Sequence, residues 1–170
     1  MRTRVLAAGV VVLSAALLTS TPAVAETRSV GDTQETFLPA RLDLTGARYT
    51  LDAHGFFAKV RVRNLRAGGY TLGFNLSRAN EEIHVTVTRF KNGQTINTIA
   101  VATKEDVVIR HCGGLDTAWK NKLDYIKVAI PWICLDNLRK DLNVQAFFGA
   151  GRGESGNPAD FLQTVKVRYN

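Results

Sequence analysis

The sequence predicts an all-β protein: a single antiparallel β-sandwich, Ig-like or jelly-roll-like, of about eight or nine short strands, with a β-barrel as the second choice. Three observations support this fold class. Runs of alternating apolar and polar residues recur along the chain, turn-forming residues separate them, and no helical periodicity repeats. With 170 residues, the chain is long enough for one domain preceded by an export signal.

The clearest strand is expected over residues 56–65, where the alternation is strict. One face would carry Phe56, Ala58, Val60 and Val62, and the other Phe57, Lys59, Arg61, Arg63 and Leu65. A second strand is expected over 70–76. The Gly68-Gly69 pair between them predicts a β-hairpin, because glycine adopts positive φ at little cost.

Asn92-Gly93 is the strongest two-residue turn signal, and it predicts a type I′ hairpin between strands at 83–88 and 95–102. Another strand is expected at 41–51, with a bulge or kink at Thr45-Gly46. Short strands are also expected at 107–112, at 142–148 and close to the C-terminus.

The segment 113–123 is the least strand-like part of the chain. Leu115, Trp119 and Leu123 follow one another at steps of four, as they would on one face of a helix. We expect either a single short helix or a loop folded over the core.

The segment 124–135 combines a half-buried strand with a proline and a cysteine. Pro131 has no backbone N–H to donate, so the strand should end there and the chain should turn out of the sheet. This turn would bring Cys134 towards Cys112, the only other cysteine, and predicts one disulfide in an exported protein. We expect Trp132 to plug the adjacent end of the core.

The N-terminus has the pattern of a secretory signal peptide. Arg2 and Arg4 precede an apolar run, and small residues at 23–25 predict cleavage after Ala25. We therefore expect a signal peptide at 1–25, a flexible leader at 26–40 and the β-sandwich domain at 41–170. The mature chain would be secreted and would have no transmembrane span.

The charge balance is basic, with 22 lysines and arginines against 15 acidic residues. Without Arg2 and Arg4 the balance is 20 against 15, a net charge of +5. The sequence predicts an anion-binding sheet face made of Lys59, Arg61, Arg63, Lys127, Lys166 and Arg168. Its partner would be an anionic cell-wall polymer, a polysaccharide or a secreted protein rather than nucleic acid.

No set of residues with a catalytic or metal-binding pattern stands out. His54, His84 and His111 are far apart in sequence, and the aspartates follow no calcium-loop spacing. The glycine-rich segment 151–156 lacks the strand–helix context of a dinucleotide-binding loop, so we interpret it as a hairpin loop. We predict no catalytic residue, no metal and no cofactor.

Three short motifs resemble a known group of proteins. They are Asp43-Leu44-Thr45, the segment 60–65 (Val-Arg-Val-Arg-Asn-Leu) and the segment 130–135 (Ile-Pro-Trp-Ile-Cys-Leu). Over roughly residues 41–160 the chain resembles small secreted β-sandwich proteins of unassigned function from high-GC Gram-positive bacteria, the actinobacteria. The resemblance implies export and a sandwich fold, and it brings no catalytic residues.

Two classes of function follow from these observations. The first is a secreted, non-enzymatic module that binds an envelope or extracellular ligand through a basic sheet face or through loops at one end. The alternative is a secreted enzyme or enzyme inhibitor whose site lies in loops without a recognisable pattern.

Overall fold

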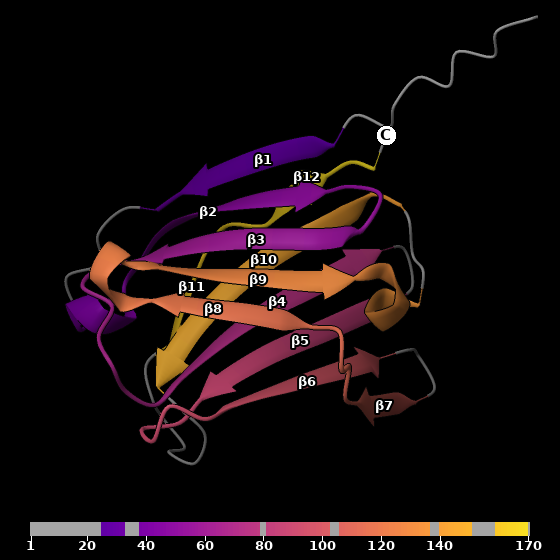
Figure 1. The fold of residues 1–170 in the computed structure, drawn as a ribbon. Coiled ribbons are helices and arrows are strands. Elements are labelled where there is room, and N and C mark those ends of the chain that lie inside the picture. Colours follow the sequence, from indigo (N-terminus) through magenta and orange to yellow (C-terminus); the bar gives the residue numbers. More distant parts are fainter. Residues whose placement is uncertain are drawn as a thin grey trace, which may run out of the picture.

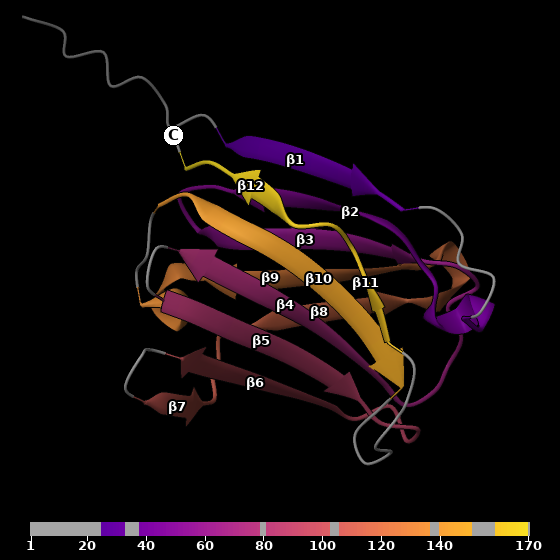
Figure 2. The same cartoon turned by 180° about the vertical axis from the view of Figure 1, so that it is seen from behind.

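The computed structural model describes residues 25–32, 38–78, 81–102, 106–136, 140–150 and 159–169. Two antiparallel sheets pack face to face (Figures 1 and 2), which confirms the all-β prediction. The strands are β1 (Glu26–Gly31), β2 (Leu44–Leu51), β3 (Gly55–Val62), β4 (Tyr70–Arg78), β5 (Glu81–Arg89), β6 (Thr95–Ala102), β7 (Val107–Arg110), β8 (Asp116–Lys120), β9 (Tyr125–Pro131), β10 (Leu142–Ala150), β11 (Ala159–Phe161) and β12 (Val165–Val167). Short 3₁₀ helices are η1 (Ala40–Leu42), η2 (Asn121–Leu123) and η3 (Trp132–Leu135).

The five-stranded sheet has the order β1-β2-β3-β9-β8. The seven-stranded sheet has the order β11-β10-β4-β5-β6-β7, and β12 also pairs with β10. The twelve strands in the described part exceed the expected eight or nine, because β1 and β8 lie in segments expected to be a leader and a helix or loop, and the three-residue β11 is too short to show alternation. No helix in the described ranges is long and apolar enough to cross a bilayer.

The core lies between the two sheets and follows the alternation of the strands. Tyr49 of β2 and Phe56 of β3 stack with their ring centroids 6.0 Å apart, and Phe74 of β4 meets Phe56 edge-on at 5.5 Å. All three side chains are fully buried. Burying a large apolar side chain contributes about 1.5–3 kcal/mol, so this cluster stabilises the contact between the sheets.

The expected hairpin between residues 56–65 and 70–76 does not form. β3 pairs with β2 and β9, whereas β4 pairs with β5 and β10 in the other sheet. Asn64 adopts a left-handed φ of 54°, and the Leu65 N–H donates to Asp124 Oδ1 at 2.8 Å. Buried Leu65 and this bond direct the chain across the sandwich instead of back along β3.

The hairpin at Asn92-Gly93 does join β5 to β6, but its turn is not of type I′. Only Gly93 has a positive φ, of 87°, and its N–H donates to the Phe90 carbonyl at 2.9 Å. The Phe90 N–H donates to the Gln94 carbonyl, which leaves a three-residue loop with glycine in the left-handed position.

The expected bulge lies in β2, where the register with β3 shifts between Leu44 and Gly46. Residues 26–31, which were expected to be part of a flexible leader, instead form β1 as an edge strand on β2. Their polar sequence suits an edge strand with little burial, so it gave no alternation signal.

The segment 113–123 holds the strand β8 and the three-residue η2, rather than the expected short helix or loop over the core. β8 pairs with β9, and Trp119 lies opposite the buried Ile126 and packs against the core. Leu123, which the helical spacing would have buried, is 65% exposed. The helical spacing of Leu115, Trp119 and Leu123 does not decide the structure here. Pairing with β9 gives the backbone N–H and C=O groups of both strands their hydrogen-bond partners.

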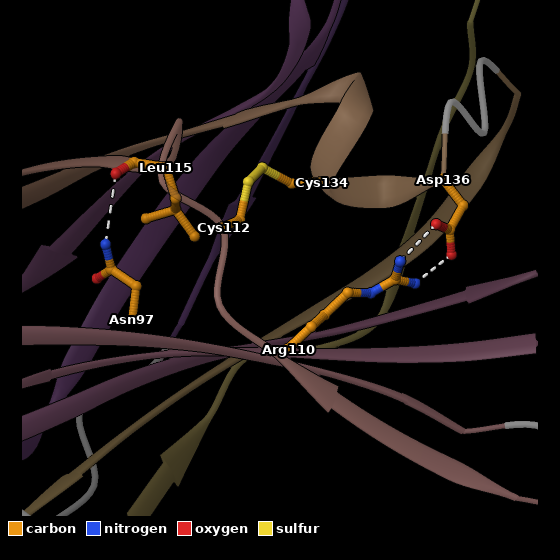
Figure 3. The surroundings of a disulfide bond; sticks show 6 residues. All are labelled: Asn97, Arg110, Cys112, Leu115, Cys134 and Asp136. Atoms are coloured by element: carbon orange, nitrogen blue, oxygen red, sulfur yellow. Dashed lines mark hydrogen bonds and ion pairs between the residues drawn. A yellow bond between two sulfur atoms is a disulfide. The ribbon is translucent and has the colours of Figure 1, made fainter.

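The disulfide Cys112–Cys134 joins the two sheets (Figure 3). Cys112 follows β7 of the seven-stranded sheet, and Cys134 lies in η3, directly after β9 ends at Pro131. Their Cα atoms are 5.7 Å apart.

Two further contacts lie at this end of the sandwich. Arg110 donates to both carboxylate oxygens of Asp136, with 2.7 Å between Nη1 and Oδ1. Trp132 of η3 is buried and donates through Nε1 to the Asp52 carbonyl at 2.7 Å, as a plug over this end of the core.

Candidate anion-binding face

One row of cations runs across the outer face of the five-stranded sheet. Arg48 of β2 lies opposite Lys59 of β3, and Lys59 lies opposite Lys127 of β9. Directly paired residues point to the same side of a sheet with their Cβ atoms about 4.5–5.5 Å apart. Three positive side chains on three adjacent strands are therefore neighbours.

A second row lies one step further along the strands. Arg61 of β3 is opposite Tyr125 of β9, and Tyr125 is opposite Lys120 of β8. We call the five cations of the two rows, Arg48, Lys59, Arg61, Lys120 and Lys127, the cationic face. None of the described strands covers the outer side of this sheet (Figure 1).

Aromatic contact fixes part of the cationic face. The Lys59 ammonium lies 4.2 Å from the centre of the Tyr125 ring, and the Lys127 ammonium lies 5.8 Å from it. Cation–π contacts at exposed sites contribute about 0.5–1 kcal/mol and limit the freedom of the amines. Two shallow hollows, of about 320 and 390 Å³, flank Lys59 and share Arg48 as a lining residue.

Within the described residues, no carboxylate lies at ion-pair distance from any member of the cationic face. Asp116 points to the same side of the sheet, but it stands in the neighbouring row, opposite Ala129. Like charges placed directly opposite one another destabilise a sheet. The arrangement therefore favours an anionic partner that would neutralise it.

The structure places the six predicted cations in three separate locations. Lys59, Arg61 and Lys127 lie together on the cationic face. Arg63 lies beyond the end of β3, and its Nε donates to the buried Asp43 carboxylate at 2.6 Å. Lys166 lies in β12 and Arg168 comes directly after it, on the seven-stranded sheet.

Lys166 pairs with Asp141 at 3.0 Å, and the Arg168 backbone N–H donates to Glu26. Arg48 and Lys120 were missed, although both are visible in the sequence as cations at alternating positions. What the sequence lacks is the strand order. Only the pairing of β2, β3, β9 and β8 makes these residues neighbours of Lys59.

Amide and imidazole side chains occupy the centre of the outer face of the seven-stranded sheet. Gln145, Asn75 and His84 lie in one row across β10, β4 and β5. The Asn75 amide donates to Gln145 Oε1 at 3.2 Å, and Asn75 Oδ1 lies 2.8 Å from His84 Nδ1. We call this row the amide ladder. Asn75 is therefore bonded on both sides within a central strand.

Two buried carboxylates, Asp43 and Asp160, lie where the two sheets meet. Asp160 accepts from the Leu44 N–H at 2.6 Å and from the Phe161 N–H at 2.7 Å, which ties β11 to β2. Burial raises the pKa of Asp160, and the negative charges of Asp32 and Asp43 add to this, against the lowering by the two N–H donors. The described residues include no group of three potential ligands able to hold a metal ion.

The three histidines lie in different parts of the structure. His54 lies in the turn between β2 and β3, while His84 belongs to the amide ladder. His111 follows β7, where its Nδ1 lies 3.0 Å from the Asn97 carbonyl. The glycine-rich segment 151–156, residues 1–24 of the signal peptide expected at 1–25, and residues 33–37 of the expected leader lie outside the described residues.

Comparison of the chain with models of protein families, with curated proteins and with solved structures finds no match.

Proposed function

We propose that the protein is a non-enzymatic binding module that acts outside the cytoplasm and binds an anionic polymer through the cationic face. One observation carries the proposal: five cations from four adjacent strands share one uncovered sheet face, and no described carboxylate pairs with them. A surface needed only for solubility mixes charges of both signs.

The geometry suits an extended polymer better than a compact ligand. Neighbouring strands lie about 4.8 Å apart, so Arg48, Lys59 and Lys127 form a line about 10 Å long. A chain with an anionic group on each repeating unit could contact several of these cations at once. The shallow hollows around Lys59 and the exposed part of Tyr125 offer contact surface for its uncharged parts.

Retention on immobilised polymers across a salt series tests the proposal. Polyglutamate and a sulfated polysaccharide serve as anionic matrices, and cellulose serves as the neutral one. We expect retention on both anionic matrices that falls steeply as salt screens the charges. The triple variant Arg48→Gln, Lys59→Gln, Lys127→Gln should weaken binding at least tenfold.

A matched control separates the cationic face from net charge. Arg66→Gln, Lys140→Gln and Arg168→Gln remove the same number of charges from exposed positions elsewhere. This variant should retain affinity within about threefold. Equal losses in the two triple variants would reduce the effect to net charge, and retention on DNA alone would contradict the proposed class of partner.

Export is the second part of the proposal, supported by the signal-like N-terminus and by a disulfide, which is stable in oxidising compartments. Cleavage after Ala25 would leave β1, which begins at Glu26, intact. Mass spectrometry of protein from the culture medium should therefore find Glu26 as the first residue. Protein kept in the cell with its N-terminus uncleaved would contradict this.

A further inference from the structure

A crevice of about 730 Å³ opens at one end of the sandwich, away from the disulfide. It lies where β4 begins and β5 ends, between η1, the loop before β4 and the hairpin between β5 and β6. In Figure 2 these elements gather at the end of the sandwich opposite η3. The volume lies within the range of about 300–1,000 Å³ that small-molecule sites occupy.

The polar lining of the crevice is basic. Arg41, Arg89 and Lys91 contribute to it together with the neutral Asn92, and none of the described lining residues is acidic. No carboxylate of the described ranges forms an ion pair with any of these three cations. Arg41 and Lys91 are exposed at the rim, and Arg89 is half-buried.

Arg89 is held in place by groups that leave its charge uncompensated. Its Nη1 donates to Asn121 Oδ1 at 3.3 Å, and its guanidinium carbon lies 5.7 Å from the centre of the Trp119 ring. Both partners are neutral: Trp119 lies in β8 of the opposite sheet, and Asn121 lies in η2 directly after it. A half-buried guanidinium fixed in this way is prepared to bind an anion with little loss of side-chain entropy.

Apart from Asn92, the remaining described lining is apolar or glycine. Leu42 and Tyr70 are buried residues at the mouth of the core, and Phe90 begins the hairpin. The Tyr70 ring packs against Phe148 at 5.4 Å, and it lies so close to Gly68 that a Cβ there would meet it at 2.9 Å. The ring therefore forms a fixed wall beside the cations.

We propose that this crevice is a binding site for a small organic anion, a phosphate or carboxylate attached to an aromatic or similarly flat apolar group. Arg89 would bind the anionic group from within, Arg41 and Lys91 would hold it at the rim, and Tyr70 and Leu42 would contact the apolar part. The site does not depend on the cationic face, from which its lining residues are distinct.

Titration of the purified protein with phenyl phosphate, followed by amide NMR and calorimetry, tests the site. We expect shifts at Gly68, Gly69 and Lys91, tighter binding than for inorganic phosphate, and weaker binding for phenol. Arg89→Met, which keeps an unbranched side chain beside Trp119, should weaken phenyl phosphate binding at least tenfold. Lys91→Gln, which changes an exposed residue of the hairpin, should weaken it about threefold.

The cationic face provides the control. The triple variant of Arg48, Lys59 and Lys127 should bind phenyl phosphate within twofold of the unchanged protein, even where it no longer binds polymer. Absence of shifts at the crevice in millimolar phenyl phosphate would overturn the proposal. So would affinities that fall in the triple variant but not in the folded Lys91→Gln variant, because the anion would then occupy the sheet face.

Discussion

The polar side chains on the two outer faces of the sandwich differ in whether they find partners within the protein. In the amide ladder, Asn75 is both donor and acceptor between Gln145 and His84, so the row is complete within the protein. On the cationic face, Arg48, Lys59 and Lys127 stand in an equivalent row with no described carboxylate partner. The amide ladder therefore contributes its hydrogen bonds to stability, whereas the cationic face keeps positive charge that no described side chain neutralises.

The largest expected effect concerns the bond that joins the two sheets. Replacing Cys112 and Cys134 by serine should lower the free energy of unfolding by roughly 3 kcal/mol, from the entropy of a loop that spans 22 positions. Denaturant unfolding measures the loss. Hydrogen exchange should show it equally at Lys59 and Asn75, and a loss confined to one sheet would mean that the sheets unfold separately.

Two glycines, one in each sheet, differ in what surrounds them: backbone atoms surround Gly55, and a side-chain ring lies over Gly73. A Cβ at Gly55 would meet the Ile130 backbone carbonyl at 2.2 Å, whereas one at Gly73 would meet the tip of the Phe147 ring. We expect Gly55→Ala to cost about 2–3 kcal/mol, because backbone must move. Gly73→Ala should cost about 1 kcal/mol, because the ring can turn away, and thermal unfolding compares the two.

Equal costs for the two glycine variants would contradict the difference in their surroundings. A larger cost at Gly73 would mean that the Phe147 ring, which packs on Phe161 with 5.7 Å between centroids, is fixed as firmly as backbone.

Single substitutions in the two rows should change stability in opposite directions. Asn75→Ala removes two side-chain hydrogen bonds and should lower the free energy of unfolding by about 1 kcal/mol. Arg48→Gln relieves repulsion with Lys59 and should raise it by about 0.5 kcal/mol. In 1 M salt the gain from Arg48→Gln should disappear, since the Debye length is then only about 3 Å.

The smallest expected effect is on the pH dependence of stability. The pKa of Asp160 is raised in the folded protein, so its contribution is present at low pH and lost as pH rises through the folded pKa. The pKa of Asp141 is lowered, first by the hydrogen bond from Lys166, so its contribution is present above the unfolded value and lost as pH falls through the folded one.

Unfolding midpoints measured from pH 3 to 7 would separate these two carboxylates. Asp160→Asn should remove the decline between the unfolded and folded pKa values of Asp160, and Asp141→Asn should remove the decline on the acid side. Profiles unchanged by both substitutions would show that other groups control the pH dependence.

Local patterns in the sequence determined several features by themselves. Strict alternation over 56–65 predicted a strand with an apolar and a cationic face, because a strand places successive side chains on opposite sides whatever it pairs with. The strand formed is β3, which ends at Val62, three residues earlier than expected. Pro131 ended β9, since proline cannot donate to the ladder, and two cysteines left one possible intramolecular disulfide. The bulge at Thr45-Gly46 was likewise a local property of glycine.

The tertiary structure alone decided which strands became neighbours. Nothing local indicated that Leu65 would take the chain to the other sheet, that Trp119 would lie in a strand on β9, or that Arg48 and Lys127 would flank Lys59. These outcomes depend on contacts between residues far apart in sequence, where burial of the whole core selects one pairing. Side-chain alternation is a property of one strand, whereas a binding face is a property of the strand order.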